Sequence, residues 1–426
     1  MPAGQGVPGL GWGFAPAGRF RCGMGEAKYR MSERGRFPPE DELLLLLARG
    51  SLTPELQERA LHLMSLEPSW PSILSRPQTY RILPLLNRHL QTLGFPGVPP
   101  QTRTKLEEVC REIAVYNALA ARELPELLRL LSAARIPAIP LKGVALAESL
   151  YGDLTVRISE DIDILVPRAM VLRAIDVIST RGYRAESARW SEKQLLNSFI
   201  EYSFVRRDGP YYYELDLHWG VLWWLPLDKG AVDDLWSEAR PGVVLGAPAY
   251  TLSPEWEFLF LAAHAARDCW QGLNWLADIQ EACARGGIDW QKVWEKARRF
   301  EWDEVLELTA SVCNYMVGTS TFANGAVREL PPWLKPYILV QQPPFWLFSL
   351  SQLHLLKHNS ERIRYILHGL FVPTSSDWEF IRLPRYLTFL YYPIRPLRVG
   401  FKFVSWIVAA GRRRIFRSAP GDATQT

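Results

Sequence analysis

Residues 136–167, IPAIPLKGVALAESLYGDLTVRISEDIDILVP, decide the fold of this chain. A short apolar strand ends at Lys142-Gly143, a helix of two turns follows over 144–152, and a second apolar strand runs over 161–167. Short apolar runs bounded by Pro and Gly are typical of strands. The stretch therefore predicts a sheet with a helix packed against it.

The residues that follow extend the same unit. Residues 170–183 are amphipathic and predict a helix, and 202–207 predict a third strand. Asp208-Gly209 is a strong hairpin turn, after which YYYELDLHWGV (211–221) returns as the partner strand. The order β-α-β-α-β-β predicts an α+β fold, with a small mixed sheet in a core of about 85 residues.

Helical patterns flank this core on both sides. Apolar residues recur at helical spacing from Asp41 to about Leu131 and again after Pro248, where Ser253 is the expected N-cap of a helix that begins at Pro254. We divide the chain into a disordered Gly/Pro-rich leader (1–38), an N-terminal helical region (39–131), the α+β core (132–247), a second helical region (248–330) and an aromatic, basic C-terminal region (331–426).

The composition excludes several classes of protein. Hydrophobic residues make up 48% and charged residues 22% of the 426 positions, which argues against wholesale disorder and coiled coils. A mean hydropathy of -0.08 argues against a polytopic membrane protein. The net charge of +4 is too balanced to demand a nucleic-acid partner. Five widely spaced cysteines suit a reducing compartment, so we expect a cytoplasmic protein.

Asp161 and Asp163 lie two residues apart on an apolar strand. Side chains of a strand alternate between faces, so both carboxylates point to one side while Ile162 and Ile164 point to the other. Two neighbouring carboxylates repel each other unless a cation lies between them, and hard oxygen ligands favour Mg²⁺. Such pairs also occur in solvated turns, but apolar residues follow this one. The pattern favours a metal site.

A second acidic strand strengthens the interpretation. In ELDLHW (214–219), Glu214, Asp216 and His218 share one face. If this strand lies beside the first, Asp216 completes a cluster of three carboxylates that could hold two metal ions about 4 Å apart. An amphipathic edge strand with a solvated polar face explains the pattern equally well. The sequence leaves open whether Glu214 or Asp216 is the third ligand.

Lys142-Gly143 lies at a strand-to-helix junction. Gly permits a close backbone approach there, and a helix N-terminus and an ammonium group both favour phosphate oxygens. Arg157 and Ser159 precede the acidic pair and could bind the same triphosphate. The simpler interpretations are a surface lysine in a turn for Lys142 and an ion pair with Glu160 for Arg157. Only the order of these residues along the chain favours phosphate binding.

These motifs together resemble a known family. LKGVALAESLYGDLTVRISEDIDILV, ELDLHW and AAHAARDCWQGLNWLADI resemble the uncharacterised nucleotidyltransferases of the polymerase-β-like superfamily, over roughly residues 105–300. The resemblance implies a minimal nucleotidyltransferase core inside a helical chain, with Asp161 and Asp163 as its metal-binding pair. It places Lys142-Gly143 where the wider superfamily has Gly-Ser. Glu160, an acid directly beside the metal pair, departs from the usual loop.

The expected function is a nucleotidyl transfer of the EC 2.7.7 type from a nucleoside triphosphate, with ATP the expected donor, to a hydroxyl group. Asp161, Asp163 and Asp216 are the expected catalytic residues and ligands of two Mg²⁺ ions. The residues expected to hold the β- and γ-phosphates are Lys142, Gly143, Arg157 and Ser159. The alternative is a catalytically silent module of the same fold that binds a nucleotide or a partner protein.

The acceptor stays open among a small molecule, a sugar, a peptide and a protein. No basic patch brackets the acidic residues, which argues against nucleic acid. His218, His264 and Asp278 are read as packing residues, since buried polar groups need partners and His–Asp is a common pair. The C-terminal stretch 381–421 carries nine Arg or Lys and no acid. We expect it to pack on the body of the protein, and favour this over peripheral membrane contact.

Overall fold

The computed structural model describes residues 37–76, 79, 81–185, 195–196, 200–221, 230–318, 322, 328–339, 345–374, 377 and 380–401. All but the last two residues of the expected leader, and the end of the basic tail (402–426), lie outside this set. Pro39–Thr426 forms one compact unit. The division of that unit into four regions stays a prediction.

The N-terminal helices form where the apolar periodicity predicts them. Pro54 occupies the first turn of its helix, and Thr53 caps that helix by accepting a hydrogen bond from the Leu56 amide. The elements are α1 (Pro39–Leu47), α2 (Pro54–Ser65), α3 (Trp70–Leu74), α5 (Leu83–Leu93) and the long α6 (Pro100–Ala133).

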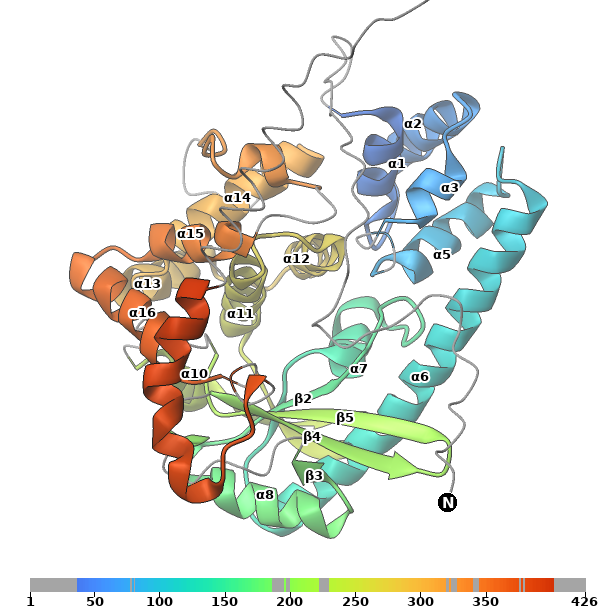
Figure 1. Ribbon diagram of the computed structural model, residues 1–426. Coiled ribbons are helices and arrows are strands. Elements are labelled where there is room, and N and C mark those ends of the chain that lie inside the picture. The colour runs from blue at the N-terminus through green and yellow to red at the C-terminus, as the bar shows by residue number, and fades with distance from the viewer. Residues whose placement is uncertain are drawn as a thin grey trace, which may run out of the picture. The chain divides into compact units, whose positions relative to one another are not determined.

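The core is a mixed five-stranded sheet of strand order β1-β2-β5-β4-β3, which confirms the α+β prediction (Figure 1). Strands β2 and β5 run parallel, and the other neighbours are antiparallel. The strands are β1 (Ile139–Pro140), β2 (Ile162–Leu165), β3 (Arg184–Ala185), β4 (Glu201–Asp208) and β5 (Tyr211–His218). Between them lie α7 (Gly143–Leu146), a π-helical turn (Ala147–Tyr151) and α8 (Val171–Thr180).

One face of this sheet packs on α6 and α8. The buried cluster joins apolar side chains of both helices to those of β2, β4 and β5, among them Leu127, Ala174, Ile164, Phe204 and Leu217. Burial of a leucine, isoleucine or phenylalanine side chain contributes about 1.5–3 kcal/mol relative to exposure. The strands therefore turn their apolar side chains to these helices and their polar side chains to the opposite face.

The hairpin turn differs from the prediction by one residue. Asp208 pairs with Tyr211, so the turn consists of Gly209 and Pro210 rather than Asp208-Gly209. Gly209 has φ +59°, a conformation that glycine adopts without strain. Strand β3 and a second hairpin, β6 (Arg240–Val244) with β7 (Ala247–Thr251), were not expected from the sequence.

Helices resume after the core, as predicted. Ser253 caps α11 by accepting a hydrogen bond from the Trp256 amide, which confirms the expected N-cap. The elements after the core are α11 (Pro254–Arg267), α12 (Leu273–Arg285), α13 (Trp290–Phe300), α14 (Asp303–Val317), α15 (Phe345–Leu355), α16 (Asn359–Phe371), two 3₁₀ turns (Lys335–Tyr337 and Arg385–Leu390) and a helix at 391–401. Helix α10 (Ala231–Glu238) lies within the predicted core, before β6. Within the described part of the chain, no helix combines the length and the hydrophobicity needed to cross a membrane.

Candidate active site

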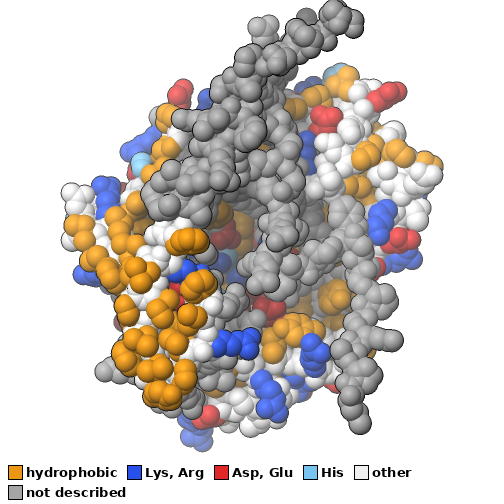
Figure 2. All heavy atoms as spheres, viewed as in Figure 1, with side chains coloured by type: hydrophobic (Ala, Val, Ile, Leu, Met, Phe, Trp, Pro, Cys, Tyr) orange, Lys and Arg blue, Asp and Glu red, His pale blue; other side chains and the backbone are white. Residues whose placement is uncertain are grey.

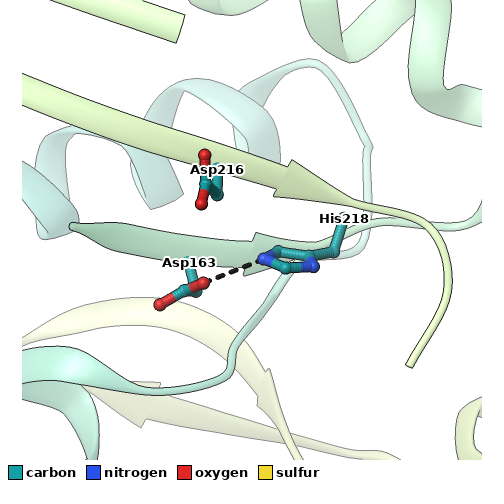
Figure 3. A group of neighbouring side chains, drawn as sticks. All are labelled: Asp163, Asp216 and His218. Carbon is teal, nitrogen blue, oxygen red and sulfur yellow. Dashed lines mark hydrogen bonds and ion pairs between the residues drawn. The ribbon is translucent and has the colours of Figure 1, made fainter. Parts of the chain in front are cut away.

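The parallel pairing of β2 and β5 places Asp163 directly opposite Asp216. Ile162, Ile164, Leu215 and Leu217 on the same strands are buried in the core. Because strand side chains alternate, the two carboxylates project together from the other face. His218, two residues beyond Asp216, lies on that face too (Figure 3). The expected neighbouring of the two acidic strands is thus confirmed.

Asp163 is the buried centre of this group. Its Oδ1 accepts hydrogen bonds from Lys142 Nζ and from His218 Nε2, both at 2.9 Å. Its Oδ2 is buried and has no hydrogen-bond partner. Burial alone would raise the pKa of Asp163, but the charges of Lys142 and His218 outweigh it and lower that pKa. The side chain is therefore ionised, with one oxygen to spare.

The other two carboxylates are half-buried beside Asp163. Asp216 Oδ1 accepts a hydrogen bond of 2.6 Å from Ser203, its register neighbour on β4, while burial raises the pKa of Asp216. Burial and the negative charge of Asp163 raise the pKa of Asp161 to about 7. These carboxylates share one electrostatic environment, in which each disfavours the ionisation of the next.

Among the described residues, Asp163, Asp216 and His218 bring candidate ligand atoms within 4.8 Å of one another. Asp161 precedes β2 and is outside that set, and so is Glu214. Of the two residues that the sequence left open as third ligand, the structure groups Asp216 with Asp163.

His218 connects this group to two residues that the sequence did not indicate. Its Nδ1 lies 3.1 Å from Glu201 Oε2, and Arg267 Nη1 on α11 lies 3.8 Å from the same oxygen. Burial opposes a charge on His218, but Glu201 and Asp163 raise its pKa to about 9. Burial would raise the pKa of Glu201, yet His218 and Arg267 hold it at about 2. Positive and negative charges thus alternate along the row Arg267, Glu201, His218, Asp163 and Lys142.

Hairpin register was the available indication for Glu201. It lies opposite His218 when pairs are counted back from the Gly209-Pro210 turn. Arg267 lies in the helical motif AAHAARDCW, in which His264 was the residue considered as a candidate. Neither the spacing nor the composition of that helix indicates that Arg267, among its residues, contacts the sheet.

Lys142 and Gly143 meet the acidic strand as a unit. The Lys142 ammonium is almost buried, and Asp163 and Asp161 raise its pKa although burial opposes this. It is therefore not a surface lysine in a turn. Gly143 has φ +63°, and a Cβ there would lie 2.6 Å from Ser159 Oγ and 3.1 Å from the Asp161 carbonyl oxygen. The close approach of these segments requires glycine at this position.

Arg157 binds Asp278 on α12. Its Nε lies 3.1 Å from both Asp278 oxygens and its Nη2 lies 3.0 Å from Oδ2, while Tyr151 donates a further bond of 3.0 Å to Oδ1. Glu160 pairs instead with Arg81, at 3.2 Å. The phosphate role of Arg157 stays a prediction, and these contacts favour a structural one.

Asn117 on α6 holds the loop between α7 and β2 in place. Its Nδ2 donates to the carbonyl oxygens of Leu154 (2.6 Å) and Arg157 (2.7 Å), and its Oδ1 accepts from the Ser159 amide (3.1 Å). The Ser159 hydroxyl donates to the Asp161 carbonyl oxygen at 3.3 Å. A fully buried amide with three satisfied bonds fixes the backbone on which Ser159 is mounted.

His264 packs against an aromatic ring, and its hydrogen-bond partner is an arginine. It stacks on Trp275, with ring centroids 4.1 Å apart, and its Nε2 accepts from Arg267 Nη2 at 2.9 Å. Burial, reinforced by the positive charges of Lys142 and Arg267, holds its pKa well below the usual value. The ring is thus neutral, and Asp278 serves Arg157.

Comparison with known proteins adds one match. A family model described as an uncharacterised nucleotidyltransferase matches residues 67–318, which include the whole sheet and every residue of the candidate site. No curated protein and no solved structure matches the chain.

Proposed function

The chain belongs to the uncharacterised nucleotidyltransferase family, and from that membership we propose that it moves a nucleotidyl group from a nucleoside triphosphate to a hydroxyl acceptor, with ATP as donor. The observation that carries the proposal is the register pairing of Asp163 with Asp216, next to a buried lysine. Carboxylates from adjacent strands, backed by one cation, suit phosphoryl chemistry, in which positioning and charge neutralisation supply most of the rate.

The donor set fits Mg²⁺. Asp163 has a buried oxygen without a hydrogen-bond partner, and Asp216 and Asp161 add carboxylates beside it. His218 has both ring nitrogens engaged, with Asp163 and Glu201, so it orients Asp163 instead of offering a free nitrogen. We assign Asp161, Asp163 and Asp216 to hold two ions. When bound, these ions would neutralise the charge that develops on the phosphates and acidify the acceptor hydroxyl.

We assign phosphate binding to the basic side chains beside the carboxylates and to the close contact between Gly143 and Ser159. We assign Lys142, which pairs with Asp163, to bind a phosphate oxygen, and Gly143 and Ser159 form the junction next to it. Arg267, which is part-exposed at the end of α11, is a second cation at the site. Arg157 is assigned to positioning the loop through Asp278.

The reaction requires one bond to form and one to break. The acceptor oxygen attacks the α-phosphorus, the bond from that phosphorus to the bridging oxygen breaks, and pyrophosphate leaves. The acceptor proton passes to a carboxylate of the cluster, for which we assign Asp216. The acceptor class extends over small molecules, sugars, peptides and proteins, and we place the reaction in the cytoplasm. The alternative is a silent module that binds the nucleotide without turnover.

Calorimetry tests the proposal with ATP, GTP, CTP and UTP, each with and without Mg²⁺. We expect wild type to bind one or more of them only with Mg²⁺, and Asp163→Asn and Asp216→Asn to weaken that binding by at least about tenfold, since each removes a charged ligand. Asp208→Asn is the matched control, because its carboxylate lies on the same hairpin but is 63% exposed at the far end.

Two outcomes would contradict the proposal. Failure of the wild-type protein to bind any of the four nucleotides overturns the donor assignment. Mg²⁺-dependent binding without pyrophosphate release, across acceptors of all four classes, favours the silent module instead.

A further inference from the structure

The apolar stripe of helix α16 faces water. Ile363, Ile366 and Leu367 follow the i, i+3, i+4 spacing of an amphipathic helix, yet they are 57%, 46% and 49% exposed. Such a stripe ordinarily packs against the core. In α16 the buried positions are Glu361 and Tyr365 on the other side. The helix therefore presents its most apolar side outward.

The helix at 391–401 continues this surface. Leu397 and Phe401 lie one turn apart and are 75% and 76% exposed, and Phe389 before them is 61% exposed. A hydrogen bond of 2.9 Å from Arg395 Nε to the Gly369 carbonyl oxygen joins the helix to the end of α16. Figure 2 shows hydrophobic side chains gathered over this end of the chain. We call Ile363, Ile366, Leu367, Phe389, Leu397 and Phe401 the C-terminal apolar face.

Among the described residues of 345–401, the exposed charged side chains are basic; one further acid of this stretch, Glu379, lies outside the described residues. Glu361 and Asp377, the two acids described there, are buried. Asp377 is also neutralised by Arg395 and Arg398, at 2.7 and 2.6 Å. Arg364 and Arg382, in contrast, are exposed. The sequence continues this bias, because 381–421 holds nine Arg or Lys and no acid.

We propose that the C-terminal apolar face docks on an anionic lipid surface. The apolar side chains would enter the boundary between headgroups and acyl chains, and the arginines would lie against lipid phosphates. Large apolar side chains that gather on an exposed surface (Figure 2) mark an interaction site. The excess of basic residues in this part of the sequence favours an anionic membrane over a protein partner, because protein interfaces are depleted of charged residues at their core. This inference goes beyond the proposed reaction and does not depend on it.

Vesicle co-sedimentation of the full chain tests the proposal. We expect wild type to bind vesicles of phosphatidylglycerol mixed with phosphatidylcholine, and Ile366→Gln/Leu367→Gln/Leu397→Gln to bind them at least about tenfold more weakly, because three apolar insertions are lost. The matched control is Val115→Gln/Tyr116→Gln, since these residues are 56% and 55% exposed on α6, away from the face. The control should bind like wild type.

A second variant tests how much the exposed arginines contribute to vesicle binding. Arg364→Gln/Arg382→Gln should weaken binding by several-fold per arginine, at about 1 kcal/mol for each cation at an anionic surface. Equal binding of wild type to pure phosphatidylcholine, or equal binding of the triple apolar variant, overturns the proposal. So does a dimer in analytical ultracentrifugation that the triple variant abolishes, because the face would then join two copies of this chain.

Discussion

Gly143 and Gly152 have nearly the same backbone conformation, with φ +63° and +62°, but different surroundings. A Cβ at Gly143 would meet Ser159 Oγ at 2.6 Å, whereas a Cβ at Gly152 would meet nothing within 4 Å. Alanine at either position incurs the strain of positive φ, about 1–2 kcal/mol. At Gly143 alone it also separates Lys142 from the acidic strand.

We therefore expect Gly143→Ala to lower the free energy of unfolding by about 2–4 kcal/mol and to weaken nucleotide binding. Gly152→Ala should lower the free energy by only about 1–2 kcal/mol and leave binding intact. Urea denaturation and calorimetry measure the two effects. Equal losses in both variants would contradict the close approach at Gly143.

His264 makes stability depend on pH. Its pKa in the folded protein is depressed by burial and by Lys142, Arg267 and His218, although Asp268 Oδ2 lies 3.7 Å from its Nδ1. The unfolded chain, with a pKa of about 6.5, then binds more protons than the folded chain. The stabilisation is complete above about pH 6.5 and is lost as the pH falls toward the folded value.

Between about pH 7.5 and 5, His264→Gln should therefore lose less stability than wild type, by about 1.4 kcal/mol for each pH unit below 6.5. Urea denaturation at several pH values measures this slope. His62→Gln, an exposed histidine on α2, is the control and should follow the wild-type slope. A His264→Gln slope equal to that of wild type would show that the folded ring titrates normally.

At the scale of elements, the loop between α7 and β2 is fastened from two helices, by Asn117 of α6 and Asp278 of α12. Asp278→Asn should lower the free energy of unfolding by about 3–5 kcal/mol, because it leaves the Arg157 charge buried and unpaired. Glu160→Gln breaks the exposed pair with Arg81 and should cost about 0–1 kcal/mol. Urea denaturation compares them, and similar values would contradict a structural role for the buried pair.

Most of the elements could be predicted, because their side chains repeat with a period that one buried face imposes. The two acidic residues of the site follow from the same rule, since Asp163 and Asp216 interrupt apolar strands at positions of one face. The short strands could not be predicted: β3 has two residues, and β6 and β7 contain Pro241, Gly242 and Pro248, which weaken a strand pattern.

Glu201 was missed because the predicted strand begins at Tyr202, whereas β4 begins at Glu201. A turn at Asp208-Gly209 would place Glu201 opposite Asp216, whereas the observed turn places it opposite His218. Moving the turn by one residue shifts every cross-strand partner by two positions, so each residue keeps its face but changes its partner. Arg157 illustrates a different limit, because its partner Asp278 lies 121 residues further along the chain. Local periodicity carries no information about such a contact.

At the scale of the whole molecule, the compact unit extends beyond the matched family span. Helix α1, which lies before residue 67, packs on α5 and α14, and its leucines are buried. Leu47→Ala should therefore lower the free energy of unfolding by about 2–5 kcal/mol, like other buried leucines. Leu61→Ala on α2 is the control, because Leu61 is 41% exposed and should change stability little.

Leu47→Ala also tests whether the compact unit unfolds in one cooperative transition. We expect the Leu47→Ala transitions followed by tryptophan fluorescence and by far-ultraviolet circular dichroism to shift together. Separate transitions would show that the N-terminal helices unfold apart from the sheet.

The chain position of the later residue in each contact sets the order in which contacts can form during synthesis. Asp163 and His218 are 55 residues apart, but Arg157 and Asp278 are 121 apart. A contact cannot form before both residues have left the ribosome. The carboxylates can therefore assemble while the loop that carries Ser159 still lacks the ion pair between Arg157 and Asp278. That fastening arrives only with α12. A nascent chain thus completes its acidic cluster well before it secures the loop beside it.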